Sequence, residues 1–477
     1  MQSDRGSPLR VLLIQPNSTH ENSKEFISLQ YPINLGYLAS SLIRAGHEVR
    51  MLDFNVIPVA ELGNTMAEYN PELVGLTAMT SAIGNAGKII RQIKAISGAQ
   101  VVIGGVHASA LPVETMESIP ELDFLVFGEG EVTLVELAEI VERKSSAEGV
   151  AGVVYQDGGR IVKNMPRPLI EDLNTLPFPA RHLLPMQLYV SHHVSRGFSR
   201  SSLRIMELMT SRGCPNKCIF CAGHHNYGNR LRFRDYENIA AEIEECRAKY
   251  GITHISIEDD TFTINRNLVV KLCRFLHERR ISWNCNTRVN TVDYELLKLM
   301  AWSGCKKVVF GVESGSPEML IKCKKAITVD DAITAVRDAK RAGIRYVECD
   351  FLLGCHPDET LEDINQTIAL IHKLRPDFLA VAVMAPYPGT EINRIMREKG
   401  LLGENPDWSQ FSHYGDLNRY ERLVNLTSRQ LVDLQRKILK DYYSSPRYIL
   451  SQALQTRTLS EVKFFAKMAW LFLKEFA

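Results

Sequence analysis

Over roughly the first 145 residues, short apolar segments alternate with segments of helical length, and this alternation restricts the possible fold most strongly. Aliphatic runs that are typical of buried strands occupy residues 10–16, 47–54, 73–77, 100–104 and 124–127. Helical patterns lie between them, at about 34–46 and 84–97, and another follows 131 as far as 143. The alternation predicts an α/β domain with a parallel, doubly wound sheet.

Ligands of doubly wound sheets bind beyond the carboxyl ends of the strands. Small and polar residues follow four of the predicted strands, at 15–17, 77–81, 104–107 and 128–131. The pair Gly104 and Gly105 removes side chains where a flat or bulky ligand can approach the backbone. Tight turns explain the same glycines equally well, so both interpretations stay open. No G-x-G-x-x-G follows the first strand, which argues against a nicotinamide cofactor.

Three cysteines lie within the eight residues that run from Cys214 through Cys218 to Cys221. Thiolates at this C-x3-C-x2-C spacing on one short loop can hold three irons of a [4Fe–4S] cluster and leave the fourth iron open for chemistry. Zinc is the main alternative and needs a fourth ligand, for which His224 or His225 are nearest. Three core cysteines without a function are a weaker explanation of such close spacing.

The cysteine pattern, with an aromatic residue at Phe220, resembles the signature of radical S-adenosylmethionine (SAM) enzymes. Blocks at later predicted strand ends also resemble that family, namely 254–262, 283–288, 308–316, 350–354 and 385–390. The resemblance implies a partial (β/α)6 barrel. The preceding domain is similar to a Rossmann-like cobalamin-binding domain in its segments 104–109 and 128–131. Together the resemblance covers roughly residues 10 to 450.

The resemblance implies roles for individual residues. Cys214, Cys218 and Cys221 would ligate the [4Fe–4S] cluster. The residues expected at SAM are Phe220 near adenine, Asp259 and Asp260 with Asp260 at the amino group, Glu313 and Ser314 with Glu313 at the ribose, and Arg288 or Lys325 at the carboxylate. A carboxylate accepts charge-assisted bonds from an ammonium group, which favours Asp260. Helix caps or loop salt bridges are the alternative roles of these charged residues.

In the cobalamin domain the resemblance has one departure. Many such domains carry D-x-H-x-x-G, whose His ligates cobalt, but this chain reads Gln-Pro-Asn-Ser-Thr-His at 15–20. The cofactor would therefore be held without a protein His on cobalt, or the domain has become a scaffold without cobalamin. His107 is a possible contact, although a lone His in a loop is commonly structural. The residues expected at cobalamin are Asn17, Thr77, Ser81, Gly104, Gly105, His107, Gly128, Glu129 and Gly130.

Cys355 follows Gly354 at the end of a predicted barrel strand, where active-site residues of such barrels lie. A cysteine there can donate a hydrogen atom or ligate a metal, which makes Cys355 a candidate catalytic residue. A buried thiol without a chemical role is the alternative. The cysteines that occur singly are expected in the core, namely Cys246, Cys273, Cys285, Cys305, Cys323 and Cys349.

Composition excludes several classes of protein. The 56 Lys and Arg residues balance 55 Asp and Glu, so nucleic acid is not an expected partner. Ten cysteines in 477 residues are too few for a disulfide scaffold, and no secretory signal is visible, so we expect a cytoplasmic enzyme. From Arg419 onward, eleven basic against five acidic residues give a net charge of +6. The amphipathic segment 459–476 is expected either on a membrane surface, as a peripheral contact, or docked on the barrel.

These observations predict four regions. They are a Rossmann-like cobalamin-binding domain at 1–145, a linker at 146–200, a radical SAM barrel at 201–420 and a helical region at 421–477. The resemblance implies methylation of an unactivated carbon of a lipid-like or secondary-metabolite substrate, with one SAM supplying the methyl group through cobalamin and another generating a 5′-deoxyadenosyl radical. Flavodoxin or ferredoxin would supply electrons. Radical cyclisation, rearrangement or oxidation without methyl transfer is one alternative, and a non-enzymatic cobalamin or iron–sulfur sensor is another.

Overall fold

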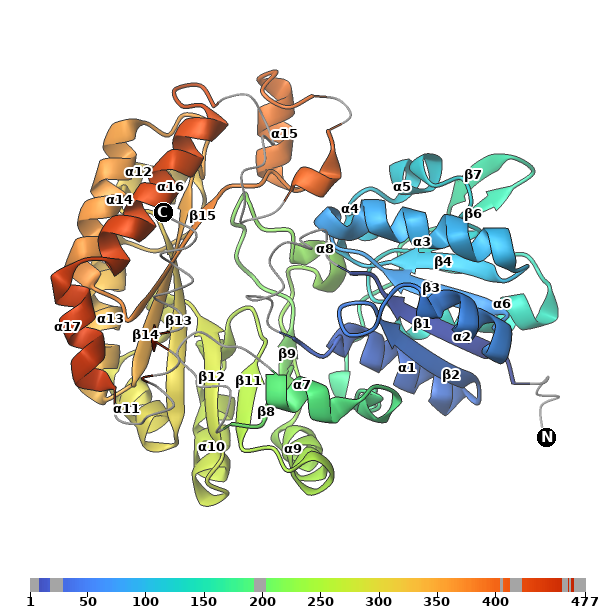
Figure 1. Cartoon of the computed structure of the whole chain (residues 1–477), viewed down its shortest axis with the longest axis horizontal. Coiled ribbons are helices and arrows are strands. Elements are labelled where there is room, and N and C mark those ends of the chain that lie inside the picture. Colours follow the sequence, from blue (N-terminus) through green and yellow to red (C-terminus); the bar gives the residue numbers. More distant parts are fainter. Residues whose placement is uncertain are drawn as a thin grey trace.

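A computed structural model describes residues 8–17, 29–192, 203–403, 406–411, 423–456, 462 and 465–466. Two α/β bodies lie side by side, one from the first third of the chain and one from the remainder (Figure 1). Each is built on its own sheet, and a helical layer from the end of the chain covers the outer side of the second body. The predicted fold class is confirmed.

The first sheet has seven strands in the order β2-β1-β3-β4-β5-β6-β7, and its first five strands are parallel. Alternate residues of β1 face opposite sides, so Val11 and Leu13 pack in one core cluster while Leu12 and Ile14 pack in another. The bounds are β1 Arg10–Gln15, β2 Glu48–Asp53, β3 Leu73–Thr77, β4 Gln100–Gly104, β5 Phe124–Val126, β6 Val153–Asp157 and β7 Arg160–Lys163.

Helices cover both faces of this sheet, as a doubly wound domain requires. Helices α1 and α6 contribute to the cluster that contains Leu13, and α2, α3 and α5 to the cluster that contains Leu12. Gly46 ends α1 in the left-handed conformation. The bounds are α1 Ile33–Ala45, α2 Glu61–Tyr69, η2 Thr80–Ala82, α3 Ile83–Ile96, α4 Val106–Ala110, α5 Pro112–Ser118 and α6 Gly130–Arg143.

Part of the predicted linker belongs to the first sheet. The hairpin β6–β7 pairs antiparallel with β5 and extends the sheet beyond residue 145. Gly158 and Gly159, both with positive φ, form its two-residue turn. The chain then runs along α1 of the first domain and on to the barrel through η3 Leu173–Thr175, η4 Arg181–Leu183 and α7 Met186–His192. The region from 146 to 200 is therefore a strand pair followed by a connection.

The second body is the predicted six-stranded parallel sheet, in the chain order β8-β11-β12-β13-β14-β15. Five of the family-like sequence blocks lie at or just after its strand ends, as expected. A separate antiparallel pair, β9 and β10, holds the cysteine loop. The bounds are β8 Ile205–Leu208, β9 Ser211–Arg212, β10 Arg232–Phe233, β11 His254–Ile257, β12 Ser282–Thr287, β13 Cys305–Glu313, β14 Tyr346–Leu353 and β15 Phe378–Val383.

Helices lie outside this sheet and polar side chains lie within its curve. Trp283 and Cys285 of β12 pack in the main core, whereas Lys307 of β13 forms a buried ion pair with Glu348 of β14, Nζ to Oε2 2.9 Å. The bounds are α8 His224–Tyr227, α9 Tyr236–Tyr250, η5 Phe262–Ile264, α10 Arg266–Glu278, η6 Val289–Thr291, α11 Tyr294–Trp302, α12 Pro317–Lys322, α13 Val329–Ala342, α14 Leu361–Leu374, α15 Glu391–Glu398 and η7 Trp408–Gln410.

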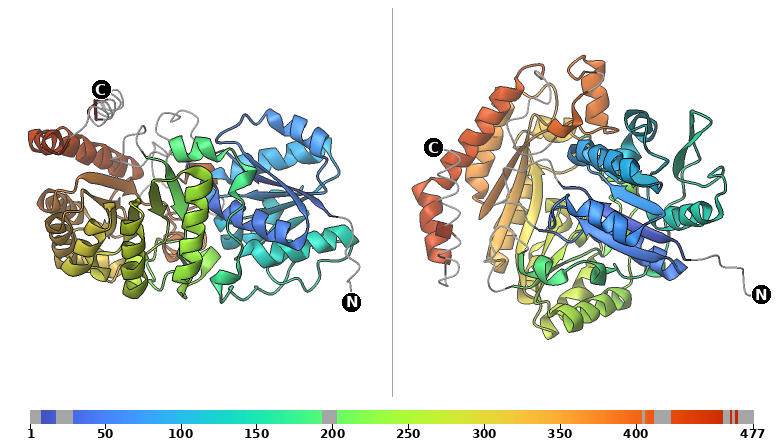
Figure 2. Two further views of the ribbon diagram at one scale, coloured as in Figure 1. Left: turned by 90° about the horizontal axis from the view of Figure 1, so that it is seen from below. Right: turned by 45° about the vertical axis from the view of Figure 1, so that its right-hand side comes forward.

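The last described helices, α16 Ser428–Tyr443 and α17 Pro446–Gln455, lie on the side of the barrel away from the first domain (Figure 2). Gln435 holds α16 to the sheet, with Nε2 donating to the Val381 carbonyl at 2.6 Å. Most of the predicted amphipathic segment 459–476 lies outside the described residues. Phe465 is described and packs beside Tyr346 and Phe378 of the barrel. No helix among the described residues is long and apolar enough to cross a membrane.

Candidate cofactor sites between the domains

The cysteine loop leaves β9 and returns to β10. Gly213 has φ +86°, and a Cβ there would lie 2.3 Å from the Arg230 carbonyl oxygen, so only glycine fits the start of the loop. The buried Ile219 fixes the loop on the barrel, because its N–H donates to the Cys323 carbonyl at 3.1 Å and its carbonyl accepts from Ile392 N at 3.0 Å. The loop is thus held rigidly over the carboxyl ends of the barrel strands.

The loop brings the three predicted cysteines near one another, with Cys214 and Cys218 partly buried and Cys221 exposed. Packing of protein around the thiol, together with the charges of Asp260, Cys218 and Cys214, raises the pKa of Cys221 to about 11. Burial also raises the pKa of Cys218, while Lys325 and Arg288 act in the opposite direction. A metal must therefore displace protons from the Cys218 and Cys221 thiols when it binds. No three His, Cys, Asp or Glu side chains among the described residues are arranged around a single-ion site.

Three predicted SAM residues lie together beside Cys218. The Arg288 Nη1 atom, just after β12, is 3.9 Å from the Cys218 sulfur, and Arg288 Nη2 donates to the Lys325 carbonyl. The Lys325 ammonium donates to Glu313 Oε1 at 2.7 Å. A register shift in β13 between Gly311 and Glu313 directs this carboxylate, and Glu313 has φ +68°. The structure therefore gathers Arg288, Glu313 and Lys325 around one thiol.

The two adjacent aspartates have different surroundings. Asp260 lies beside the Cys221 end of the loop, because its Oδ2 atom is 3.6 Å from where a Cβ on Gly223 would be. Asp259 instead is buried and accepts hydrogen bonds from Thr210 N and Oγ1 at 2.7 and 2.5 Å and from Ser211 Oγ at 2.6 Å. Both Asp259 oxygens therefore hold the strand that leads into the cysteine loop, which differs from the predicted contact with SAM.

Two other predicted SAM residues lie in packed surroundings. Ser314 is buried, with its Oγ 3.3 Å from Thr367 Oγ1 and accepting from Ser316 N at 3.1 Å. Its hydroxyl therefore joins β13 to α14. Phe220 is half-buried, and its side chain packs against the main core. Its backbone lies in the loop between Cys218 and Cys221.

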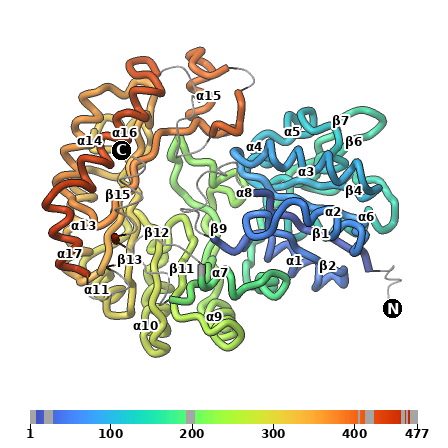
Figure 3. The backbone as a smooth tube through the Cα atoms, viewed as in Figure 1, coloured from blue at the N-terminus to red at the C-terminus, as the bar shows by residue number. Residues whose placement is uncertain are grey.

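A cavity of about 80 Å³ opens at the carboxyl ends of β1, β3, β4 and β5. Six predicted cobalamin residues line it, namely Thr77, Gly104, Gly105, Gly128, Glu129 and Gly130. Asn226 and Tyr227 of α8, only a few residues after Cys221, line its other side. Figure 3 shows α8 between α4 of the first domain and β9 of the barrel. The cavity and the cysteine loop therefore adjoin through this short helix.

The remaining predicted cobalamin residues, Asn17, Ser81 and His107, are not among the residues that line this cavity. His107 is buried, lies with Nδ1 3.3 Å from Thr80 Oγ1, and packs edge-on against Trp408 with ring centres 5.6 Å apart. Burial lowers the pKa of His107 to about 4. The imidazole is therefore neutral at neutral pH and is packed against protein groups, Thr80 and Trp408.

Glu129 lines the cavity, but both of its carboxylate oxygens bind protein groups, whereas a contact with cobalamin was predicted. Oε1 accepts from Arg212 Nη1 at 2.9 Å, and Oε2 accepts from Arg232 Nη1 and Ile170 N, both at 2.7 Å. Sequence reasoning did not anticipate either arginine. The arginines at 230, 232 and 234 indicated a charged segment, but this pattern did not identify their partners, because Arg230 pairs with Glu171 and Arg234 with Glu242.

Cys355 is fully buried, unlike a catalytic residue at an open mouth. Its Sγ donates to Glu359 Oε1 at 3.5 Å, and its carbonyl accepts from Cys323 Sγ at 3.2 Å. A hydrogen bond with Cys323 and burial raise the pKa of Cys355 well above its usual value. The thiol is therefore protonated and enclosed, which favours the structural alternative.

The neighbouring Glu359 gives a pH test of this buried cluster. Burial raises the pKa of Glu359 to about 7, so the unfolded chain releases this proton near pH 4.5 and the folded chain does so only near neutrality. Stability must therefore fall as pH rises between these values. We expect wild type to lose about 2 to 3 kcal/mol more than Glu359→Gln between pH 5 and pH 8 in urea unfolding. Equal losses in the two proteins would contradict this assignment.

Comparisons with known proteins agree with this geometry. Residues 208–371 match the radical SAM superfamily, and residues 26–138 match the B12 binding domain. An uncharacterised methyltransferase of Pyrococcus horikoshii is 32% identical over 452 residues, which cover 94% of this chain and 95% of the relative. The chain belongs to the B12-binding radical SAM enzyme family.

Two further comparisons show what the sequence and the fold are similar to. A cytidylyl-2-hydroxyethylphosphonate methyltransferase of Streptomyces wedmorensis is 27% identical, with 82% of each chain covered. The solved structure of the cobalamin-dependent radical SAM enzyme OxsB with aqua-cobalamin bound has a TM-score of 0.75 and 18% identity, covering 98% of this chain and 71% of that one. The predicted order of a B12-binding domain followed by a radical SAM domain is confirmed.

Proposed function

We propose that this radical SAM enzyme transfers a methyl group from SAM through cobalamin to an unactivated carbon of a small molecule. The observation that carries the proposal is the position of Asn226 and Tyr227. They follow Cys221 closely in the chain, yet they line the cavity at the strand ends of the B12-binding domain. A radical site and a methyl-carrier site that share a wall can act on one substrate.

The cysteine loop fits the cluster, and the glycine-lined strand ends fit the edge of cobalamin, because a cavity of about 80 Å³ is far smaller than the whole cofactor. Cys214, Cys218 and Cys221 would hold a [4Fe–4S] cluster, and Gly104 and Gly128 leave the wall of the cavity free of bulky side chains for cobalamin. When bound, the cluster supplies the electron that cleaves SAM to a radical, and cobalamin carries the methyl group. The protein contributes orientation and exclusion of water.

The chain's own side chains would orient SAM beside the cluster. Arg288, whose Nη1 atom is 3.9 Å from the Cys218 sulfur, would bind the SAM carboxylate. Asp260 lies at the Cys221 end of the loop, where a carboxylate can accept bonds from the SAM amino group. Glu313 would take the ribose hydroxyls, while Lys325 holds its carboxylate in place at 2.7 Å. Asp259 acts indirectly, by holding Thr210 and Ser211 before the loop.

For the substrate we propose a lipid-like or secondary-metabolite molecule, with electrons from a flavodoxin or ferredoxin in the cytoplasm. The relatives named as methyltransferases support transfer of a methyl group. Cyclisation, rearrangement or oxidation by the same radical is the second candidate, because the cluster and SAM residues alone suffice for it.

Product analysis separates these candidates. The anaerobically reconstituted enzyme, with hydroxocobalamin and a strong reductant, is incubated with SAM that carries a deuterated methyl group. We expect both S-adenosylhomocysteine and 5′-deoxyadenosine, and loss of S-adenosylhomocysteine when cobalamin is omitted. Deoxyadenosine alone, with cobalamin present, would favour the reaction without methyl transfer. Formation of neither product would contradict an enzymatic role and favour the sensor.

A further inference from the structure

Four buried charged side chains join the two domains. Arg212 of β9 donates through Nη1 to Glu129 Oε1 at 2.9 Å and through Nη2 to Glu131, and Arg232 of β10 donates to Glu129 Oε2 at 2.7 Å. Glu129 belongs to the turn after β5 and Glu131 to the first turn of α6, which follows directly, whereas the arginines belong to the strand pair that holds the cysteine loop. Each of these side chains is at most 7% exposed.

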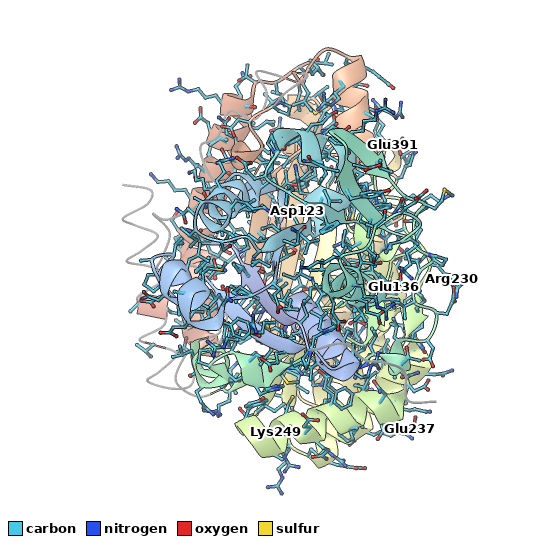
Figure 4. The ribbon with its side chains drawn as sticks, turned by 90° about the vertical axis from the view of Figure 1, so that its right-hand side faces the viewer. Asp123, Glu136, Arg230, Glu237, Lys249 and Glu391 are labelled. Atoms are coloured by element: carbon cyan, nitrogen blue, oxygen red, sulfur yellow. The ribbon has the colours of Figure 1, made fainter. Side chains whose placement is uncertain are left out.

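Such burial distinguishes this network from surface ion pairs. Lys249, on the outer surface of α9 in Figure 4, pairs with Glu245 at 2.8 Å, but both side chains remain largely solvated. An exposed pair of that kind contributes about 0 to 1 kcal/mol. Breaking a buried pair leaves an uncompensated charge and is strongly destabilising, so the buried groups must keep their mutual geometry. The rings of Tyr37 and Tyr227, 5.1 and 5.0 Å from the Arg212 guanidinium, restrict it further.

The two ends of the network reach the two proposed cofactor sites. Glu129 and Glu131 line the cavity of the first domain, together with the glycines on either side of Glu129. Arg212 precedes Cys214 by one intervening residue, Gly213, and pairs in register with Arg232. Neither arginine lines the cavity. Any displacement of the turn after β5 is therefore transmitted to the residues next to the first cysteine.

We propose that Arg212 and Arg232 are positioning residues that couple the cobalamin cavity to the cysteine loop and fix the separation of the two cofactors. The inference rests on the proposed function, which requires both cofactors. A fixed separation matters because displacements of about 1 Å between reacting groups can reduce rates 10²-fold. Coupling between sites is reciprocal, so a change at the arginines must be measurable at both of them.

The test compares buried arginines in the full-length, cluster-containing enzyme. Arg212→Lys keeps the charge but loses the double contact with Glu129 and Glu131. We expect its affinity for hydroxocobalamin to fall by at least about tenfold, within the range of measured couplings, although Arg212 does not line the cavity. The electron paramagnetic resonance signal of the reduced cluster should change in the same variant. Arg232→Lys should show both effects, and it replaces Arg212→Lys as the test variant if Arg212→Lys does not fold.

Arg181→Lys is the matched control. Arg181 is equally buried and pairs with Glu242 at 2.6 Å beside β8, but it has no ion pair with the turn after β5. Equal losses of affinity in Arg181→Lys and Arg212→Lys would show general destabilisation and overturn the inference. Unchanged affinity and an unchanged cluster signal in Arg212→Lys would also overturn it. A wild-type enzyme that binds no hydroxocobalamin would instead contradict the proposed function, and with it the coupling.

Discussion

Cys218→Ala is expected to reduce 5′-deoxyadenosine formation from SAM to below about 0.1% of the wild-type rate, because the cofactors carry the difficult chemistry. Cys218 lies between the other two thiols in the loop and beside Arg288 and Lys325. Removing its sulfur removes one of the three proposed iron ligands. It also removes the group beside which Arg288 and Lys325 lie. The measurement is deoxyadenosine by mass spectrometry, with the iron content of the same preparation.

Cys246→Ala is the control for the loss of a thiol. Cys246 is buried on α9 within the main core and away from the loop. This variant should keep the iron content and the rate of SAM cleavage of wild type, with only a loss of stability from the smaller side chain. Full iron content and undiminished SAM cleavage in Cys218→Ala would contradict the proposed cluster site.

Gly105→Ala is expected to lower the affinity for hydroxocobalamin by at least about tenfold, since backbone strain at such a position costs about 1 to 3 kcal/mol. Gly105 has φ +98°, and a Cβ there would lie 2.7 Å from Thr77 Oγ1 and 2.8 and 2.9 Å from Ala78 O and N. Something must therefore move, and the nearest atoms belong to the edge of the cavity. Titration followed by visible absorbance measures the affinity.

Gly98→Ala provides the comparison for Gly105→Ala. Gly98 lies in the same domain just before β4, has no positive φ, and a Cβ there would meet no atom within 4 Å. The Gly98→Ala variant should keep the wild-type affinity for hydroxocobalamin and the wild-type melting temperature. Equal affinities of Gly105→Ala and Gly98→Ala for hydroxocobalamin would show that the backbone at this strand end does not shape the site.

Local patterns were sufficient to predict the first sheet, because strand and helix periodicities are properties of neighbouring residues. The barrel sheet was expected instead from the family resemblance of the cysteine motif and of the later sequence blocks. The cysteine spacing similarly predicted a shared loop. The hairpin at 153–163 was missed, although Asp157-Gly158-Gly159 is a strong signal for a two-residue turn between strands. The predicted domain boundary at residue 145 lay close to the end of the preceding helix α6, at Arg143.

Side-chain partners were much harder to predict than strand ends. Asp259 and Asp260 are adjacent, but the backbone directs one toward Thr210 and the other toward the cysteine loop. Glu129 meets an arginine 83 residues away, and nothing in the local sequence encodes that pairing. His107 was ambiguous for the same reason, since the Trp408 ring that packs against it is distant in the sequence.

The central claim is that one chain holds an iron–sulfur cluster and cobalamin in adjoining sites. Iron, sulfide and cobalamin content of enzyme purified anaerobically from cobalamin-replete cells tests it most directly, together with the visible spectrum. The account predicts about four irons and one cobalamin per chain. About four irons without cobalamin, even after reconstitution, would leave a radical enzyme but contradict methyl transfer through cobalamin.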